Sequence, residues 1–141
     1  MTESKFVFST TIPETQIEQL HALYQHEWWS RERTLTEVKA VLEHSDFVFA
    51  FCEQSSGCLI AFARVLTDRV FKALIFDVIV APDYRGEGLG QQLMERIIEC
   101  PKLRSVQDLE LYCLPELVPF YEKLGFSTDV SGVSLMRKRN V

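Results

Sequence analysis

One segment in the middle of the chain carries most of the information about the fold: Val78-Ile79-Val80-Ala81-Pro82-Asp83-Tyr84-Arg85-Gly86-Glu87-Gly88-Leu89-Gly90. It begins inside a nearly continuous apolar run, residues 70–81, which is typical of a strand covered on both faces. Pro82 ends that strand, and three glycines form the turn. Apolar residues then recur at helical spacing over residues 89–100, until Pro101 ends the helix. The segment predicts a buried strand that leads through a glycine-rich turn into a helix.

Further elements are predicted on both sides of this segment. Before it, we expect a strand at residues 5–9, a helix from Pro13 to about residue 26, a second helix that begins at the capping box Thr34-Leu35-Thr36-Glu37, and strands at 47–53 and 58–67. After it, we expect a strand at residues 109–113, a helix at 115–124 closed by Gly125, and two final strands at 126–129 and 133–136.

The order of these elements predicts the fold class. The helix at 89–100 connects two strands, 70–81 and 109–113, and such a crossover makes them parallel, whereas hairpins make the earlier neighbours antiparallel. We therefore predict an α+β fold with a mixed, mainly antiparallel sheet flanked by helices and one parallel crossover. A length of 141 residues fits a single domain over residues 1–141.

The composition excludes several functional classes. The chain is 47% apolar and 25% charged with a net charge of −5, as in a globular protein. Its basic cluster Arg137-Lys138-Arg139 is too small for the basic stripe of a nucleic-acid binder. No apolar run approaches the roughly 20 residues of a membrane span, and residues 1–8 lack the apolar core of a secretory signal. We expect a cytoplasmic protein that binds neither nucleic acid nor membranes.

The cysteines and histidines do not predict a metal site. Cys52, Cys58, Cys100 and Cys113 form no C-x-x-C pair, and the three histidines do not lie at zinc-ligand spacing beside them. Without a secretory signal we expect free, buried thiols, with a disulfide between Cys52 and Cys58 across a hairpin as the alternative.

The glycine turn has the chemistry of a phosphate site. Glycines let successive backbone N–H groups converge, and the N-terminus of the following helix adds a partial positive charge. The spacing is neither the G-x-G-x-x-G of a dinucleotide-binding turn nor that of a P-loop. A tight strand–helix junction with no ligand is the alternative.

Two motifs resemble one family. Arg85-x-x-Gly88-x-Gly90 is similar to the R/Q-x-x-G-x-G/A signature of the GNAT superfamily of N-acetyltransferases, and it stands between strand and helix as in that family. About 30 residues later, Leu117-Val118-Pro119-Phe120-Tyr121-Glu122-Lys123-Leu124-Gly125-Phe126 resembles the family's second recurring segment, with an opening similar to arylalkylamine N-acetyltransferases.

The resemblance implies acetyl-coenzyme A (acetyl-CoA) as the cosubstrate, with no metal. It implies that the diphosphate is held by the backbone of Arg85, Gly86, Glu87, Gly88, Leu89 and Gly90. It also implies that the pantetheine pairs with the strand edge at Val78, Ile79 and Val80, where that strand and the next splay apart between Val80 and Cys113.

Amine acetylation needs groups that move protons. Only about one alkylamine molecule in 10³ is neutral at pH 7, so a base must remove a proton before attack. Asp77, a lone carboxylate in an apolar strand, is the candidate base; recognition of the amine, or a carboxylate satisfied by neighbouring basic groups, are the alternatives. Tyr121 matches the tyrosine that the family commonly uses as general acid, with a core aromatic as the alternative. Cys113 has no local His to activate it, which favours direct transfer.

These observations predict direct acetyl transfer from acetyl-CoA to a primary amine of a small molecule. Trp28, Trp29, Arg31 and Arg33 follow the first helix, where this fold places acceptor-site elements. We expect the two tryptophans to pack against the sheet, and binding of an aromatic amine by their faces is the alternative. A protein lysine or N-terminus is the alternative acceptor, and a CoA-binding sensor without turnover is the competing class. The resemblance also allows a homodimer.

Overall fold

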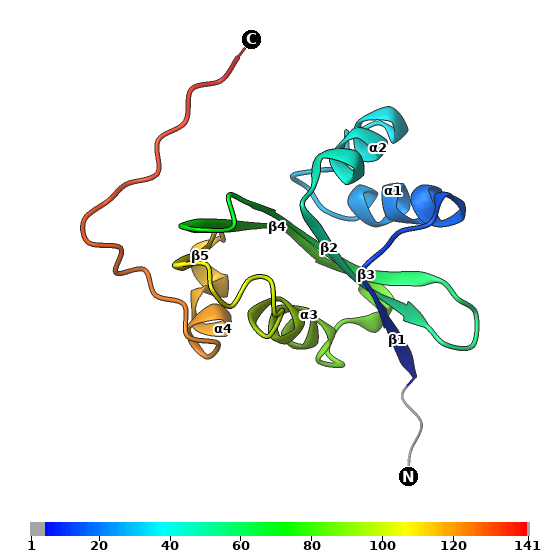
Figure 1. Ribbon diagram of the computed structural model, residues 1–141. Helices are drawn as coiled ribbons and strands as arrows, with labels where there is room; N and C mark the ends of the chain where they lie inside the picture. The colour runs from blue at the N-terminus through cyan, green and yellow to red at the C-terminus, as the bar shows by residue number, and fades with distance from the viewer. Residues whose placement is uncertain (1–4, 141) are drawn as a thin grey trace.

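The computed structural model describes residues 5–140, and its centre is a five-stranded sheet (Figure 1). The strands lie in the order β1-β2-β3-β4-β5. Neighbours from β1 to β4 are antiparallel, and β5 pairs with β4 in the parallel direction. Their bounds are Phe6–Ser9, Phe47–Glu53, Leu59–Thr67, Lys72–Val80 and Asp108–Leu111. The predicted mixed sheet with one parallel crossover is confirmed.

Helices cover both faces of this sheet. Those of the described residues are α1, Ile17–Gln25; α2, Leu35–His44; α3, Leu89–Ile98; and α4, Val118–Glu122. α1 and α2 lie on one face, and α3 and α4 lie on the other (Figure 1). The predicted capping box begins α2, because the Thr34 hydroxyl and the Glu37 carboxylate each accept the other residue's backbone N–H. Over residues 5–140, none of the helices is long and apolar enough to cross a membrane.

Each face of the sheet has its own core. The core beneath α1 and α2 is built from buried residues that include Leu20, Tyr24, Val38, Phe62 and Ile79. The core beneath α3 and α4 is larger and includes Phe49, Ile75, Leu93, Ile97 and Tyr121. β3 and β4 contribute to both cores, as expected from their nearly continuous apolar sequences.

β3 and β4 form a hairpin whose turn is held by one side chain. The Asp68 carboxylate oxygen Oδ1 accepts backbone N–H groups from Val70 at 2.8 Å, Phe71 at 2.8 Å and Lys72 at 3.1 Å. Arg69, within this turn, has a positive φ of 68°. Such an aspartate-centred turn replaces the backbone hydrogen bonds that the strands lose where the chain reverses.

β4 departs from regular pairing at two places. On the β3 side, the register shifts between Phe62 and Arg64, and the bulged residue Asp77 has a φ of 57°. On the β5 side, pairing ends at Ile75 and Leu111, although β4 continues to Val80. The two central strands therefore part next to the bulge, as the family resemblance implied, and their pairing ends before Val80 and Cys113.

The expected strands at residues 126–129 and 133–136 are absent, and this prediction was wrong. Gly125 does end the preceding helix with a positive φ of 97°, but residues 127–140 have no strand partner in the described part of the chain. The segment runs away from the sheet (Figure 1). Val133, Leu135 and Met136 are 61–90% exposed. The alternating pattern that predicted strands provides no stability without a paired edge and a buried face.

Candidate functional site

The turn after β4 combines two left-handed glycines with an uncapped helix start. After a 3-10 turn at Pro82–Tyr84, Gly86 and Gly88 have φ values of 86° and 82°. Gly88 is the N-cap residue of α3 and has no side chain to accept a capping hydrogen bond. The first N–H groups of the helix are therefore left for another acceptor. A Cβ at either glycine would meet nothing within 4 Å. The turn is open, and its geometry fits the diphosphate of acetyl-CoA.

The edge of β4 beside this turn is available for pairing. Beyond Ile75 it has no strand partner on the β5 side among the described residues. Val78 and Val80 pack toward the core beneath α3, whereas Ile79 belongs to the other core. An extended chain that enters the gap from the α3 side can therefore lie along the strand without displacing a neighbour.

Arg85, the first residue of the signature, connects three elements. Its Nε donates to the carbonyl oxygen of Val80 at 3.1 Å, and its Nη2 forms an ion pair with Glu27 Oε1 at 3.0 Å. Glu27 follows α1, so the pair joins the glycine turn to the end of that helix. Sequence reasoning missed this contact, since the two residues are 58 positions apart.

Tyr121 lies in the core beneath α3 and α4, in the same cluster as Val78 and Val80 of β4. The side chain is buried and contacts the rings of Phe120 and Phe126 at centroid distances of 4.9 and 6.0 Å. Burial first, and then the nearby Cys113, raise the pKa of its hydroxyl to about 12. Within residues 5–140 the Tyr121 hydroxyl has no hydrogen-bond partner. Every fully buried side-chain oxygen or nitrogen there has a partner, so the Tyr121 hydroxyl oxygen is not fully buried and reaches solvent. A phenol held protonated there can donate a proton.

The cysteines lack the features of a nucleophile or a disulfide. Partial desolvation of the sulfur raises the pKa of the Cys113 thiol, although the residue as a whole is exposed, and this keeps the thiol protonated at neutral pH. All four cysteines are free, so the alternative of a bridge between Cys52 and Cys58 is excluded here. Cys58 and Cys113 are exposed rather than buried, contrary to expectation. No cluster of three metal-ligating side chains occurs within residues 5–140.

Asp77 is held by three hydrogen-bond donors. Its Oδ2 accepts from Arg64 Nε at 2.6 Å, from the Tyr24 hydroxyl at 2.7 Å and from Arg33 Nη1 at 2.8 Å. Burial by itself would raise the pKa of this carboxyl, but the hydrogen bonds and charges of Arg64 and Arg33 outweigh it and lower the pKa. The geometry therefore favours a carboxylate satisfied by basic groups over a general base.

The residues around Asp77 were not predicted as a site. Tyr24 comes from α1, Arg33 from the loop before α2, and Arg64 from β3. The available signal was that Arg64, like Asp77, is a charge in an otherwise apolar strand. Trp28 is 65% exposed and Trp29 is 38% exposed, and Trp29 packs edge-on against Tyr24 of α1, so the expected packing of the two tryptophans against the sheet was wrong.

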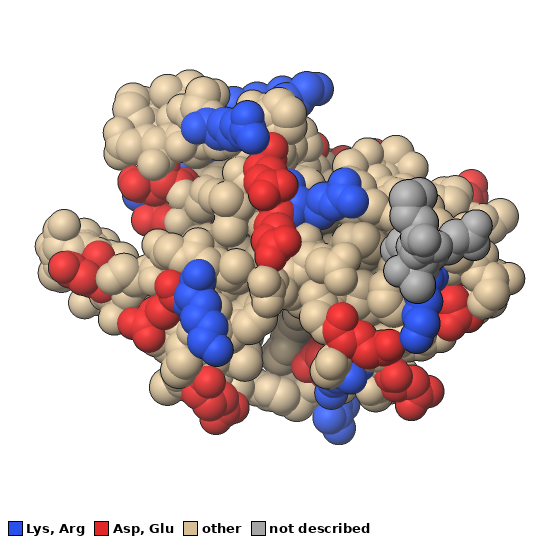
Figure 2. Space-filling view, turned by 90° about the horizontal axis from the view of Figure 1, so that it is seen from below, with Lys and Arg blue, Asp and Glu red and all other residues tan. Residues whose placement is uncertain are grey.

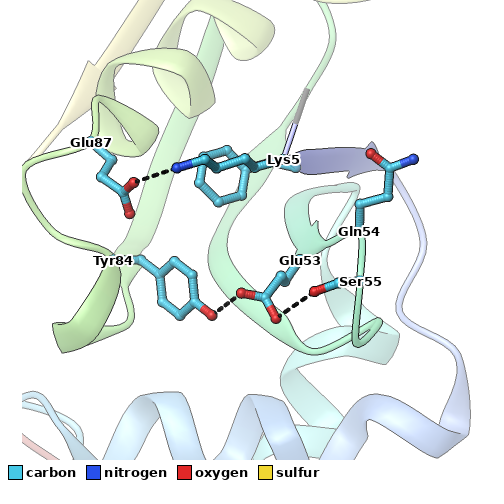
Figure 3. A pocket seen from close by; sticks show the side chains of 7 residues that line it. Lys5, Glu53, Gln54, Ser55, Tyr84 and Glu87 are labelled. Carbon is cyan, nitrogen blue, oxygen red and sulfur yellow. Dashed lines mark hydrogen bonds and ion pairs between the residues drawn. The ribbon is translucent and has the colours of Figure 1, made fainter. Parts of the chain in front are cut away.

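A separate hollow of about 540 Å³ lies on the other side of the glycine turn. Its lining comes from β1, the β2–β3 turn and the glycine turn, and Figure 3 shows Lys5 extended toward Glu87 and the Tyr84 hydroxyl hydrogen-bonded to Glu53. The Glu87 side chain thus faces this hollow, away from the gap. Seen from the side of α3 and α4, the surface mixes both charge signs without a continuous basic patch (Figure 2).

Comparison with known proteins agrees with this geometry. Residues 13–126 match the model of the acetyltransferase (GNAT) family. An uncharacterized N-acetyltransferase of Porphyra purpurea is 33% identical over 136 residues, which cover 95% of this chain and 78% of that protein. Serotonin N-acetyltransferase 2, chloroplastic, of Oryza sativa is 37% identical over 72% of this chain, and histone acetyltransferase TAP1 of Glycine max is 35% identical over 83%. The matches span only 54% of each of these two relatives.

The similarity extends to the complete fold. A putative acetyltransferase of the GNAT family from Xanthomonas campestris superposes with a TM-score of 0.81 at 26% identity, over 99% of this chain and 96% of the other. The match includes the signature at Arg85, Gly88 and Gly90 and the region of Tyr121. The family model covers well over half of the chain, and the glycine turn, the parted strands and the fold agree with it. The chain therefore belongs to the GNAT family of acetyltransferases.

Proposed function

We propose that this protein transfers the acetyl group of acetyl-CoA directly to a primary amine of a small molecule, with both bound at once. The observation that carries the proposal is the gap between β4 and β5, which opens where their pairing ends at Ile75 and Leu111, before the glycine turn. The proposal is supported by Tyr121, which packs in the same core as Val78 and Val80 and lies near Cys113, just beyond β5.

The chain's own residues would hold the cosubstrate in two ways. The backbone from Arg85 to Gly90 would bind the diphosphate through N–H groups and the positive end of α3. The β4 edge at Val78, Ile79 and Val80 would bind the pantetheine amides by strand-like hydrogen bonds. Acetyl-CoA, when bound, supplies an acetyl group activated as a thioester.

The chemistry requires a neutral amine and a protonated leaving group. The amine nitrogen forms the new C–N bond to the acetyl carbon, the C–S bond breaks, and its electron pair leaves on sulfur as a thiolate. Tyr121 donates its proton to that sulfur, and the proton lost by the amine passes to solvent and returns to the tyrosine. Asp77 is a positioning residue here, because its lowered pKa makes it a poor base.

The small-molecule acceptor is the finer part of the proposal. It is supported by the relative named as a serotonin N-acetyltransferase, whereas the relative named as a histone acetyltransferase supports a protein acceptor as the second candidate. A cytoplasmic location stays a prediction, and a relative named as chloroplastic makes a plastid the alternative to test.

Ligand binding and turnover test the proposal in sequence. Acetyl-CoA at about 100 times its dissociation constant should stabilise the fold by about 2.7 kcal/mol, measured as a thermal shift. A panel of amines should then release free CoA thiol, and lysine-containing peptides added to the panel test the protein acceptor. No thermal shift would overturn the cosubstrate assignment. A shift without turnover of any acceptor would favour a CoA-binding sensor.

A further inference from the structure

We infer that Arg33 and Arg64 form an anion-binding subsite for the acceptor, so that the preferred amine carries a carboxylate or a phosphate. The inference rests on the proposed function and specifies the substrate class. Its starting observation is the shared carboxylate: two guanidinium groups pair with a single oxygen of Asp77.

The charge of this cluster does not balance. Arg33 and Arg64 contribute two positive charges and Asp77 one negative charge, while burial and Asp77 raise the pKa of Tyr24 and keep it neutral. No other carboxylate forms an ion pair with either arginine among the described residues. The ring of His21 contacts the backbone carbonyl of Arg33 and the side chain of Gln25. Hydrogen bonds from Thr34, and then the nearby charge of Arg33, lower the pKa of the Glu37 carboxyl, but Glu37 forms no ion pair with Arg33. One positive charge of the cluster therefore has no ion-pair partner within residues 5–140, although the whole chain carries −5.

The unused donors are accessible. A guanidinium has five N–H donors, and each arginine gives Asp77 only one nitrogen, Nη1 of Arg33 and Nε of Arg64. The terminal nitrogens of Arg64 have no acceptor within residues 5–140. Every fully buried polar side-chain atom there has a hydrogen-bond partner, so these nitrogens are not fully buried and reach solvent. The Arg33 side chain is 29% exposed and that of Arg64 13%. Both arginines therefore keep donors that a ligand anion can use without displacing Asp77.

Aromatic rings pack against both guanidinium groups. The Arg33 guanidinium carbon lies 4.8 Å from the ring centre of Tyr24 and 5.4 Å from that of Trp29, and the Arg64 guanidinium carbon lies 4.9 Å from that of Phe76. A guanidinium held against aromatic rings loses less freedom on binding, and its planar set of donors suits a carboxylate or phosphate. The arrangement resembles a prepared binding surface more than two mobile surface charges.

The subsite lies next to the gap but on the opposite face from Tyr121. Arg64 pairs across the strands with Phe76, the residue at which β4 leaves β5, and Phe76 contacts the ring of Tyr112 just beyond β5 at 5.8 Å. Tyr24 and Asp77 place the arginines beneath α1 and α2, whereas Tyr121 lies beneath α3 and α4. An acceptor that enters from the α1 side would place its anion on the arginines and its amine at the gap.

Matched pairs of amines test the inference with the unmodified protein. Tyrosine is compared with tyramine, and O-phosphoethanolamine with ethanolamine, with CoA release expressed per neutral amine to correct for amine pKa. A charge-assisted contact predicts that kcat/KM is at least about tenfold higher for the anion-bearing member. The pair with the larger ratio identifies carboxylate or phosphate. Equal or reversed ratios in both pairs overturn the inference, whereas no turnover of any amine overturns the proposed function instead.

A variant separates binding from structural support. Arg33→Gln leaves Arg64 on Asp77 and should lower kcat/KM about tenfold for the anion-bearing amine, mainly through KM, while the uncharged member changes less than about twofold. Arg33→Lys should restore part of the loss. Arg104→Gln, which removes the same charge from an exposed site after α3, is the matched control. If Arg33→Gln lowers kcat/KM equally for both amines while acetyl-CoA still stabilises the variant, the arginine is only structural and the inference fails.

Discussion

The two faces of β4 carry two kinds of binding surface. On the α3 side, the glycine turn and the strand edge offer backbone groups, and side-chain identity matters chiefly where a Cβ would be strained. On the α1 side, the surface around Asp77 is built from charged side chains contributed by three separate elements. The first surface therefore tolerates many substitutions of its side chains, whereas the second depends on the identity of each charged residue.

The largest expected effect comes from removing the centre of the charged surface. Asp77→Ala leaves two arginines close together without a carboxylate, which should lower the free energy of unfolding by about 3 kcal/mol; we take the lower end of the usual range because Arg33 is partly exposed. Urea unfolding followed by tryptophan fluorescence measures it, with the exposed Asp83→Ala as control. A loss below about 0.5 kcal/mol would show that solvent already satisfies the arginines.

The pH dependence of stability provides a second test of the ion pairs of Asp77. The folded-state pKa of Asp77 is lowered, so its contribution to stability is present above the ordinary pKa near 4 and is lost as the pH falls through the folded value. The wild type should therefore lose more stability than Asp77→Asn on titration below about pH 4. Parallel loss in both proteins would contradict the ion-pair geometry.

Tyr121→Phe tests the α3 side. The ring contacts with Phe120 and Phe126 remain, so folding and acetyl-CoA binding should be unchanged, while kcat falls about 100-fold with loss of the proton donor. Calorimetric titration with acetyl-CoA and thiol-release kinetics separate the two quantities. An unchanged kcat would assign Tyr121 to the core alone.

Two glycine substitutions should give opposite results on one turn. Gly88→Ala forces a Cβ into the left-handed region at φ 82° and should cost about 1–2 kcal/mol of stability. Gly90→Ala should be neutral or stabilising, since the added Cβ meets only the ring of Phe120 at 3.7 Å and alanine favours the helix. Thermal unfolding with and without acetyl-CoA measures both. Equal effects would contradict a turn defined by backbone conformation.

The smallest effect is expected at the entrance to α2. Thr34→Ala removes one half of the capping box and should lower stability by about 1 kcal/mol. Because Thr34 follows Arg33, fraying there should also raise KM for anion-bearing amines more than for uncharged ones. The neighbouring exposed Thr36→Ala serves as the comparison. If KM stays constant while stability falls, the helix cap does not help to position Arg33.

The two faces of β4 also differ in how much the sequence predicts. The α3 face was predictable because its residues are contiguous: Arg85, Gly88 and Gly90 stand within one turn, and the helix that follows has a regular apolar period. The charged cluster was not, because Tyr24, Arg33 and Arg64 are 53, 44 and 13 positions from Asp77. Only the folded chain brings them together.

The failure at the C-terminal segment has a different cause. Residues 126–136 show the alternation of a strand, but alternation reports which face would be buried, and not whether a neighbouring edge exists to pair with. The opposite outcome is seen at β5, where Asp108–Leu111 also alternates polar and apolar residues but forms a strand because β4 provides its parallel partner.

The hairpin of β3 and β4 has a consequence for the order of folding. Its turn is closed locally by Asp68, and the ion pair of Arg64 with Asp77 spans only 13 residues, so both require little loop-closure entropy. The parallel pairing of Lys72 with Asp108 must wait for α3 to form and cross over. Contacts of short sequence separation form fastest. We therefore expect a nascent chain to hold part of its charged cluster before the gap for the cosubstrate exists.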